Sequence, residues 1–145
     1  MTDLSQFIAK EKLMEVEYPT IDGFKIQIVY IAREQIQKLF NQSSMVKFSK
    51  ITHQREETTD NEKFLRLFTE KTIRGWSGLT RKALASLVPV EDSFIIGHEA
   101  EEVEYSPENA LTLISNSTDF DRFINDTLRN VEEFNLQTKK TTIKN

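Results

Sequence analysis

The stretch MEVEYPTIDGFKIQIVY, residues 14–30, alternates apolar and polar side chains on both sides of the pair Asp22-Gly23. This alternation predicts two β-strands, because successive side chains of a strand point to opposite faces. An Asp-Gly pair accepts the positive φ angles of a tight turn, so the strands are expected to form a hairpin. One face is expected to pack against the rest of the protein, because an isolated hairpin is marginally stable in water. That face carries Met14, Val16, Tyr18, Phe24, Ile26, Ile28 and Tyr30.

The spacing of apolar residues changes directly after the hairpin. Ile36, Leu39 and Phe40 lie on one side of a helical period and predict a short helix over residues 33–41. Residues 45–51 fit either a third strand or a loop. Residues 53–62 contain no apolar side chain, so they have nothing to bury and are predicted to form a solvent-exposed loop.

A broad apolar stripe with helical spacing begins at Phe64 and ends near Trp76. Thr59 or Asp60 is placed to cap the helix that this stripe predicts. Gly75 then introduces a turn.

A second glycine, Gly78, follows the tryptophan, so the chain is able to turn sharply on both sides of it. Thr80 is placed to cap a further helix over residues 83–88, which Pro89 ends. The expected motif is therefore helix, tight turn, helix.

Two more helices are predicted near the C-terminus. Ser106-Pro107 is a strong start signal, because serine accepts a backbone N–H and proline has no donor to leave unpaired in the first turn. A helix follows through Ile114, and Thr118 or Asp119 begins another whose apolar positions recur up to Phe134.

The whole pattern predicts an α+β fold, with a small N-terminal β-hairpin or sheet followed by a mainly α-helical body. The 145 residues are enough for one compact domain. We expect this domain over residues 1–136, with a β-rich part containing one short helix at 1–52 and a helical part at 60–136. Residues 137–145 carry three lysines and little to bury, which predicts a mobile tail.

Composition removes several classes of function. The chain has no cysteine, which excludes disulfides, thiolate nucleophiles and thiolate metal sites. The 19 basic residues against 23 acidic ones give a formal charge of −4, so nucleic-acid binding is not expected. The N-terminal residues do not form a secretory signal, and no apolar run is long enough to span a membrane, so a cytoplasmic protein without membrane contact is expected.

A search for catalytic constellations finds little. His53 and His98 are the only histidines and do not form a zinc-binding helix motif, and the four glycines form no phosphate-binding loop. Residues 91–108 form a mixed loop with seven acidic side chains, whose order lacks the ligand pattern of a calcium loop. We therefore expect no catalytic residue, no metal and no cofactor, and interpret the acidic run as a solvated surface or a site for a basic partner.

Three short motifs occur in a characteristic order: GWSGLT at residues 75–80, YSPENAL at 105–111 and FDRFI at 120–124. In this order the chain resembles the tail assembly chaperones of tailed bacteriophages over about residues 12–134. The resemblance implies a non-enzymatic protein that coats the long, helical tape-measure protein and keeps it soluble until the tail-tube protein polymerises around it. It also implies a location in the host bacterial cytoplasm and absence from the mature virion.

The residues expected to contact a partner are chosen from the apolar pattern alone: Ile26, Ile28, Tyr30, Trp76 and Leu79. The hairpin edge also offers a site for self-association. Alternatives to the chaperone hypothesis are a head–tail connector or another phage morphogenesis adaptor, and a small regulatory protein that binds a helical partner. A further alternative is an enzyme with a metal-assisted site at Glu99, Glu101, Glu102 and Glu104.

Overall fold

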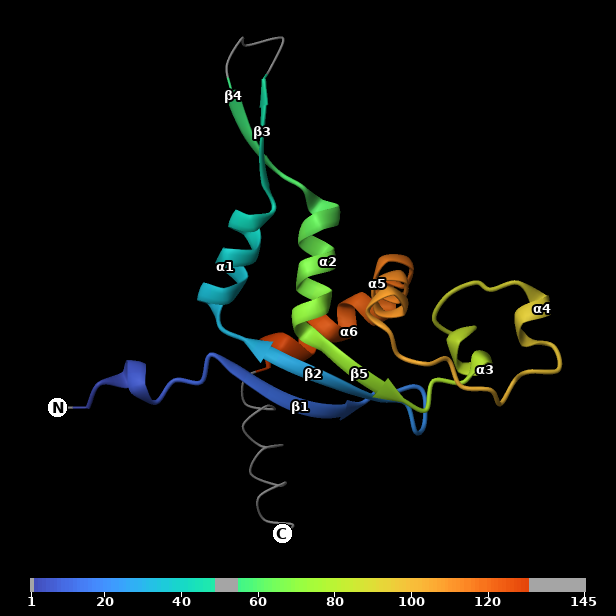
Figure 1. Cartoon of the computed structure of the whole chain (residues 1–145). Helices are drawn as coiled ribbons and strands as arrows, with labels where there is room; N and C mark the ends of the chain where they lie inside the picture. The colour runs from blue at the N-terminus through green and yellow to red at the C-terminus, as the bar shows by residue number, and fades with distance from the viewer. Residues whose placement is uncertain (1, 49–54, 131–145) are drawn as a thin grey trace.

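A computed structural model describes residues 2–48 and 55–130 of the chain. Its centre is a three-stranded antiparallel sheet in the order β1-β2-β5, formed by β1 (Glu11–Glu17), β2 (Lys25–Ile31) and β5 (Ile73–Ser77) (Figure 1). β1 and β2 pair along their full length, and Gly23 has a φ of 81° in the turn between them. The predicted hairpin is confirmed.

The apolar face of this hairpin supplies one side of the main core. Phe24, Ile26 and Ile28 have no exposed surface, and Met14 and Tyr18 are buried with them. Helices α5 (Pro107–Asn116) and α6 (Thr118–Arg129) contribute the opposing side chains. These include Ala110, Leu113, Ile114, Phe120 and Ile124.

A smaller core cluster lies at the end of β2, on the other face of the strand. Val29 and Ile31 are buried there with Leu39 and Phe68. Leu39 belongs to α1 (Arg33–Gln42), which begins two residues after β2, and Phe68 belongs to α2 (Asn61–Thr72). Because these two helices pack beside the strand end, β2 is buried on both faces there.

Most of the predicted helix starts are confirmed by their caps. The Asp60 carboxylate accepts the Lys63 N–H at 3.1 Å and begins α2, and the Ser106 hydroxyl accepts the Asn109 N–H at 3.0 Å and begins α5. Ser117 caps α6, which begins at Thr118 as predicted and is described as far as Arg129. The predicted continuation to Phe134, and the predicted tail at 137–145, lie outside the described residues.

The interpretation of residues 53–62 as a solvent loop is wrong in its described part. β3 (Ser44–Phe48) pairs with β4 (Arg55–Thr59) in an antiparallel hairpin, and α2 already begins at Asn61. Backbone hydrogen bonds between two adjacent segments form this hairpin without the apolar alternation by which strands are recognised. The hairpin extends beyond the ends of α1 and α2, away from the three-stranded sheet (Figure 1).

The predicted helix up to Trp76 is also wrong in its last turn. α2 ends at Thr72, and residues 73–77 form strand β5 beside β2. Ile73 has no exposed surface, and its carbonyl accepts the Tyr105 hydroxyl at 2.9 Å. Pairing and burial override the helical spacing, so the motif is helix, strand, helix rather than helix, turn, helix.

The segment after β5 is less helical than its sequence indicates. α3 spans only Arg81–Leu84, and residues 85–88 continue as turns. The acidic stretch contains a short helix, α4 (Asp92–Ile95), and a bridge between Thr80 and Glu102. In the N-terminal segment a single 3-10 turn, η1 (Leu4–Gln6), precedes the sheet. The fold class is α+β, as predicted.

Candidate functional site

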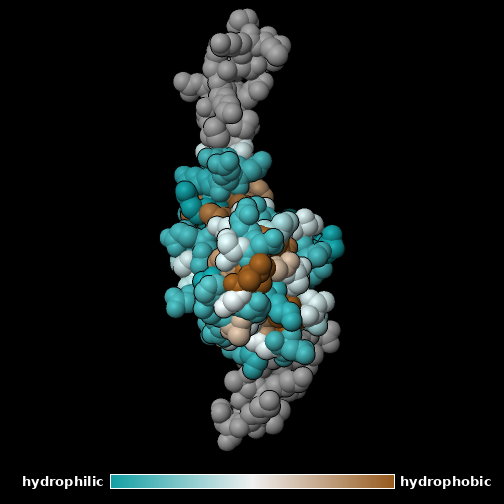
Figure 2. All heavy atoms as spheres, turned by 90° about the vertical axis from the view of Figure 1, so that its right-hand side faces the viewer, coloured by the Kyte–Doolittle hydropathy of each residue, from teal (hydrophilic) through white to brown (hydrophobic). Residues whose placement is uncertain are grey.

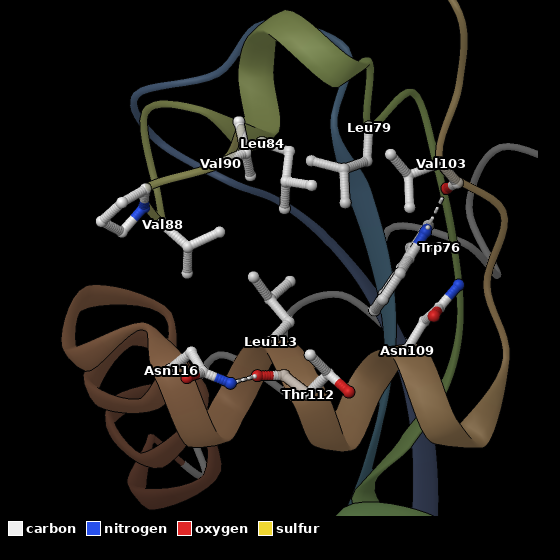
Figure 3. Close-up of a pocket in the computed structure, with 11 residues that line it drawn as sticks. Trp76, Leu79, Leu84, Val88, Val90, Val103, Asn109, Thr112, Leu113 and Asn116 are labelled. Carbon is white, nitrogen blue, oxygen red and sulfur yellow. Dashed lines mark hydrogen bonds between the residues drawn. The ribbon is translucent and has the colours of Figure 1, made fainter. Parts of the chain in front are cut away.

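An apolar groove opens between α5 and the segment that follows β5. Its volume is about 450 Å³. Leu84, Val88 and Val90 form one wall and α5 forms the other, with Leu113 pointing into the space between them (Figure 3). The complete lining is Trp76, Leu79, Leu84, Val88, Pro89, Val90, Val103, Asn109, Thr112, Leu113 and Asn116.

Short hydrogen bonds fix one end of this groove. The Trp76 indole Nε1 donates to the Val103 carbonyl at 2.9 Å, and the Val103 N–H donates to the Leu79 carbonyl at 2.7 Å (Figure 3). Trp76 also packs edge-on against Tyr105, with 5.3 Å between ring centroids. The tryptophan is thus held in one orientation with part of its surface exposed to the groove.

Gly78 explains how the chain reaches this position. Its φ is +78°, and a Cβ at this residue would overlap the backbone carbonyl of Gly23 in the β1–β2 turn. The close approach of the two backbones therefore requires glycine. It directs the chain from β5 into Leu79, which is fully buried, and on to the Thr80 cap of α3.

The groove continues toward α4. An adjoining cavity of about 470 Å³ shares Leu84, Pro89 and Val90 with it and reaches Glu91 and Phe94. Figure 2 looks onto the side of the molecule that carries α3 and α4 and shows a hydrophobic patch surrounded by hydrophilic side chains. Apolar and polar side chains thus lie side by side on this face of the molecule (Figure 2).

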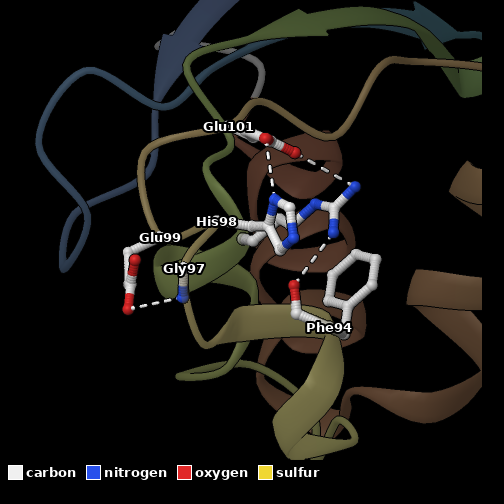
Figure 4. Close-up of polar contacts among 6 residues, drawn as sticks. Phe94, Gly97, His98, Glu99 and Glu101 are labelled. Carbon is white, nitrogen blue, oxygen red and sulfur yellow. Dashed lines mark hydrogen bonds and ion pairs between the residues drawn. The ribbon is translucent and has the colours of Figure 1, made fainter.

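Arg81 holds the α4 segment in place. Its Nη1 donates to the Phe94 carbonyl at 2.9 Å, and its guanidinium carbon lies 4.2 Å from the centroid of the Phe94 ring. Its Nη2 lies 3.2 Å from Glu101, which also contacts His98 Nδ1 at 2.8 Å (Figure 4). The hydrogen bond with His98 lowers the pKa of the exposed Glu101 carboxyl from its usual value. These contacts fix α4 and the loop after it against the start of α3.

Acidic side chains dominate the surroundings of the groove. Residues 83–121 contain nine Asp and Glu and no Lys or Arg. Some of these carboxylates have partners: Glu102 accepts the Gly78 N–H, and Glu99 accepts the Gly97 N–H. Hydrogen bonds from the backbone N–H groups of Glu99 itself and of Gly97 lower the pKa of the Glu99 carboxyl. Within the described chain, the carboxylates of Glu91, Asp92 and Glu104 make no hydrogen bond or ion pair.

The five predicted contact residues separate into three groups. Ile26 and Ile28 have no exposed surface and act as core residues of the sheet. Trp76 and Leu79 both line the groove, although Leu79 is fully buried. Tyr30 is partly buried and lines a separate cavity of about 340 Å³ beside α1 and α6. The prediction that any of them contacts a partner stays a prediction.

Sequence reasoning misses the aliphatic wall of the groove. The apolar pattern places Leu84 and Val88 in the stripe of a helix, and Val90 in no element. The available signal is Pro89, which ends helical structure and leaves aliphatic side chains on an irregular segment. Leu113 lies on the opposite wall, on α5, and the sequence does not show which segment packs opposite this helix.

No group of three or more His, Asp or Glu side chains is placed to hold a metal ion among residues 2–48 and 55–130. In the same ranges, no helix combines the length and apolar character needed to cross a membrane.

Comparison with known proteins decides the origin of the chain. The model of a family described as YdaY prophage protein matches residues 28–145. The chain belongs to this family. The matched range contains every residue that lines the groove. No curated protein and no solved structure matches the chain. The expected phage origin is thus supported at the level of a prophage protein.

Proposed function

We propose that this prophage protein is a tail assembly chaperone that binds the tape-measure protein without catalysing a reaction. The observation that carries the proposal is the open apolar groove between α5 and residues 84–90. Exposed apolar surface bordered by polar residues is typical of protein-binding sites. The groove contains no charged side chain in its lining, which suits the packing of aliphatic groups better than proton transfer.

A tape-measure protein is expected to be long and largely helical, and its amphipathic helices expose apolar stripes before the tail is built. A helix of this kind binds by inserting side chains at helical spacing into an apolar groove. Trp76 supplies a large, rigid contact surface at one end, and the aliphatic wall of Leu84 and Val88 accepts branched side chains. The groove thus matches the client that the proposal requires.

The rest of the proposal concerns how such a protein acts. Several copies bound along one client chain would gain avidity even if each contact is weak. The formal charge of −4 on every copy would keep the coated client dispersed. We place this activity in the host cytoplasm, with release when the tail-tube protein takes over the client, so that the chaperone is absent from the finished virion.

The direct test is co-expression with the tape-measure protein of the same prophage. We expect the tape-measure protein to stay soluble with the wild-type chain and to precipitate without it. Thr112→Arg should abolish this protection, because Thr112 is exposed and its replacement would fill the groove. Ser115→Arg is the matched control, since Ser115 is exposed on the same helix but does not line the groove.

Two results would overturn the proposal. The first is an insoluble tape-measure protein in the presence of a folded wild-type chain. The second is a stable ring of fixed copy number by native mass measurement, which is the behaviour of a head–tail connector rather than of a transient coat.

A further inference from the structure

We infer that the groove selects a cationic amphipathic helix, with aliphatic residues that enter the groove and Lys or Arg residues on its flanks. The inference rests on the proposed function in that it takes the groove to be the client site. It adds the charge of the client segment, which neither the fold nor the family specifies.

The chain segment around the groove carries an excess of negative charge. Of the nine acidic residues between positions 83 and 121, Asp119 pairs with Arg122, and Glu99 and Glu101 have cationic neighbours in Lys82 and Arg81. Arg81, just before this segment, is already engaged by Glu101 and Phe94. The carboxylates of Glu91, Asp92 and Glu104 therefore remain without an ion pair in the described chain. Complementary charge on a partner would be attracted to them.

Two of these three carboxylates belong to residues that adjoin the groove lining in sequence. Val90 and Val103 both line the groove (Figure 3). Glu91 directly follows Val90 and lines the adjoining cavity, whereas Glu104 directly follows Val103. A helix that occupies the groove would thus lie next to the acidic segment, because Glu91 and Glu104 each adjoin a lining residue in sequence.

The groove suits a bound helix better than a bound strand. A strand needs a free sheet edge, and beside the groove residues 102–103 already pair with the segment that directly follows β5. Thr80 bridges Glu102, and the Val103 N–H bonds to Leu79. The Tyr105 hydroxyl donates to the Ile73 carbonyl. Side chains rather than backbone groups must therefore make the contact, and a helix presents side chains on one face.

The experiment uses the full chain and three synthetic helices of about twenty residues, with the same leucines at helical spacing. Their flanking positions carry Lys, Gln or Glu. Trp76 is the single tryptophan and lines the groove, so its fluorescence reports binding directly. We expect the Lys helix to bind about tenfold more tightly than the Gln helix, because three exposed ion pairs together give an effect of this order. Raising the salt concentration should reduce this difference.

A triple variant, Glu91→Gln, Asp92→Asn and Glu104→Gln, should bring the Lys helix to the affinity of the Gln helix. The matched control changes net charge equally with Glu15→Gln, Glu34→Gln and Asp126→Asn, which lie on β1, α1 and α6. This control should keep the preference for Lys, which separates a local effect from one of net charge.

The possible failures are distinguishable. Equal affinity for the Lys and Glu helices would overturn the inference but leave the proposed function standing, since the groove would still bind a helix. Loss of the preference in both triple variants alike would also overturn it. If no helix binds, the inference is wrong, and the co-expression test decides separately whether the chaperone proposal survives.

Discussion

The two hairpins of this protein share antiparallel pairing but differ in what surrounds them. In the β1–β2 hairpin, one face is covered by the side chains of α5 and α6, and a third strand pairs with β2. The β3–β4 hairpin forms a separate two-stranded sheet that extends away from the body (Figure 1). Both hairpins form by backbone pairing, and the main core is built on the first. A hairpin contributes most to stability where its apolar face is covered.

The sequences of the two hairpins differ in the same way. Residues 14–30 supply large apolar side chains at alternate positions, whereas the strands of the second hairpin read SMVKF at residues 44–48 and REETT at residues 55–59. At the base of the second hairpin, the Asp60 N–H donates to the Ser43 carbonyl at 2.7 Å, where Asp60 also caps α2. We therefore expect the global stability to depend strongly on the first hairpin and weakly on the second.

The largest effect is expected for Phe24→Ala in β1–β2. Phe24 has no exposed surface, and its ring lies 5.8–6.3 Å from those of Tyr18, Trp76 and Phe120. Removing it should lower the free energy of unfolding by about 3–5 kcal/mol through lost burial and a residual cavity. Urea denaturation followed by circular dichroism measures this change.

Phe40→Ala is the comparison for that variant. Phe40 lies on α1 near the second hairpin, is 41% exposed, and stacks on Phe64 at 4.2 Å between centroids. Its loss should lower the free energy of unfolding by about 1 kcal/mol, in the range of a single aromatic pair. Equal losses for the two variants would contradict the distinction between the hairpins.

The next largest loss of stability is expected at the close contact between Gly78, at the start of the segment that forms the groove, and Gly23 in the β1–β2 turn. Gly78→Ala should destabilise the protein by about 3 kcal/mol, because a positive φ is strained for alanine and the new Cβ meets the Gly23 backbone. Gly97→Ala is the control: its φ is +82°, but an added Cβ would meet no other part of the chain within 4 Å. It should lose only about 1–2 kcal/mol from the backbone conformation. Thermal unfolding of both variants tests whether the close approach matters.

A smaller effect is expected for Ser117→Ala between α5 and α6. The Ser117 hydroxyl is buried and accepts the Phe120 N–H at 3.1 Å. Alanine would leave this N–H without a partner and lower the free energy of unfolding by about 1–2 kcal/mol. Ser117→Thr, which keeps the hydroxyl, should lose less; a loss as large as that of alanine would argue for packing instead of capping.

The sequence predicted the first hairpin because several signals agreed there: alternation, an Asp-Gly turn and one apolar face. It also predicted the caps Ser106 and Thr80, and gave Asp60 with Thr59 as alternatives for the third, because each cap is a local hydrogen bond. It did not predict β5, because Ile73 and Trp76 continue the helical spacing of α2, and only the available edge of β2 makes them a strand.

The groove was predictable only in part. Trp76 and Leu79, two of the predicted contact residues, lie in its lining, but Leu113 joins them through tertiary packing across more than thirty positions of sequence. Ile26 and Ile28 illustrate the limit of a sequence pattern. An apolar face that packs inside the protein and one that binds a partner have the same residue pattern, so the pattern alone did not separate core from surface.

The smallest effect is expected from removing the second hairpin. Replacing residues 44–59 with a short Gly-Ser linker should change the midpoint of thermal unfolding by less than about 4 °C, which corresponds to less than about 1 kcal/mol. Ser43 and Asp60 are already hydrogen-bonded, so a short loop can join them without moving α1 or α2. Circular dichroism at increasing temperature measures the midpoint.

This variant also tests what the second hairpin is for. If the midpoint falls by much more, the hairpin supports the smaller core of Val29, Ile31, Leu39 and Phe68, and both hairpins are structural. If the midpoint is unchanged but the tape-measure protein is no longer kept soluble, the hairpin contributes to client binding in addition to the groove. If neither the midpoint nor the solubility of the tape-measure protein changes, both stability and client binding depend on the rest of the protein. The comparison then becomes one between a hairpin that builds the fold and one that neither builds it nor binds the client.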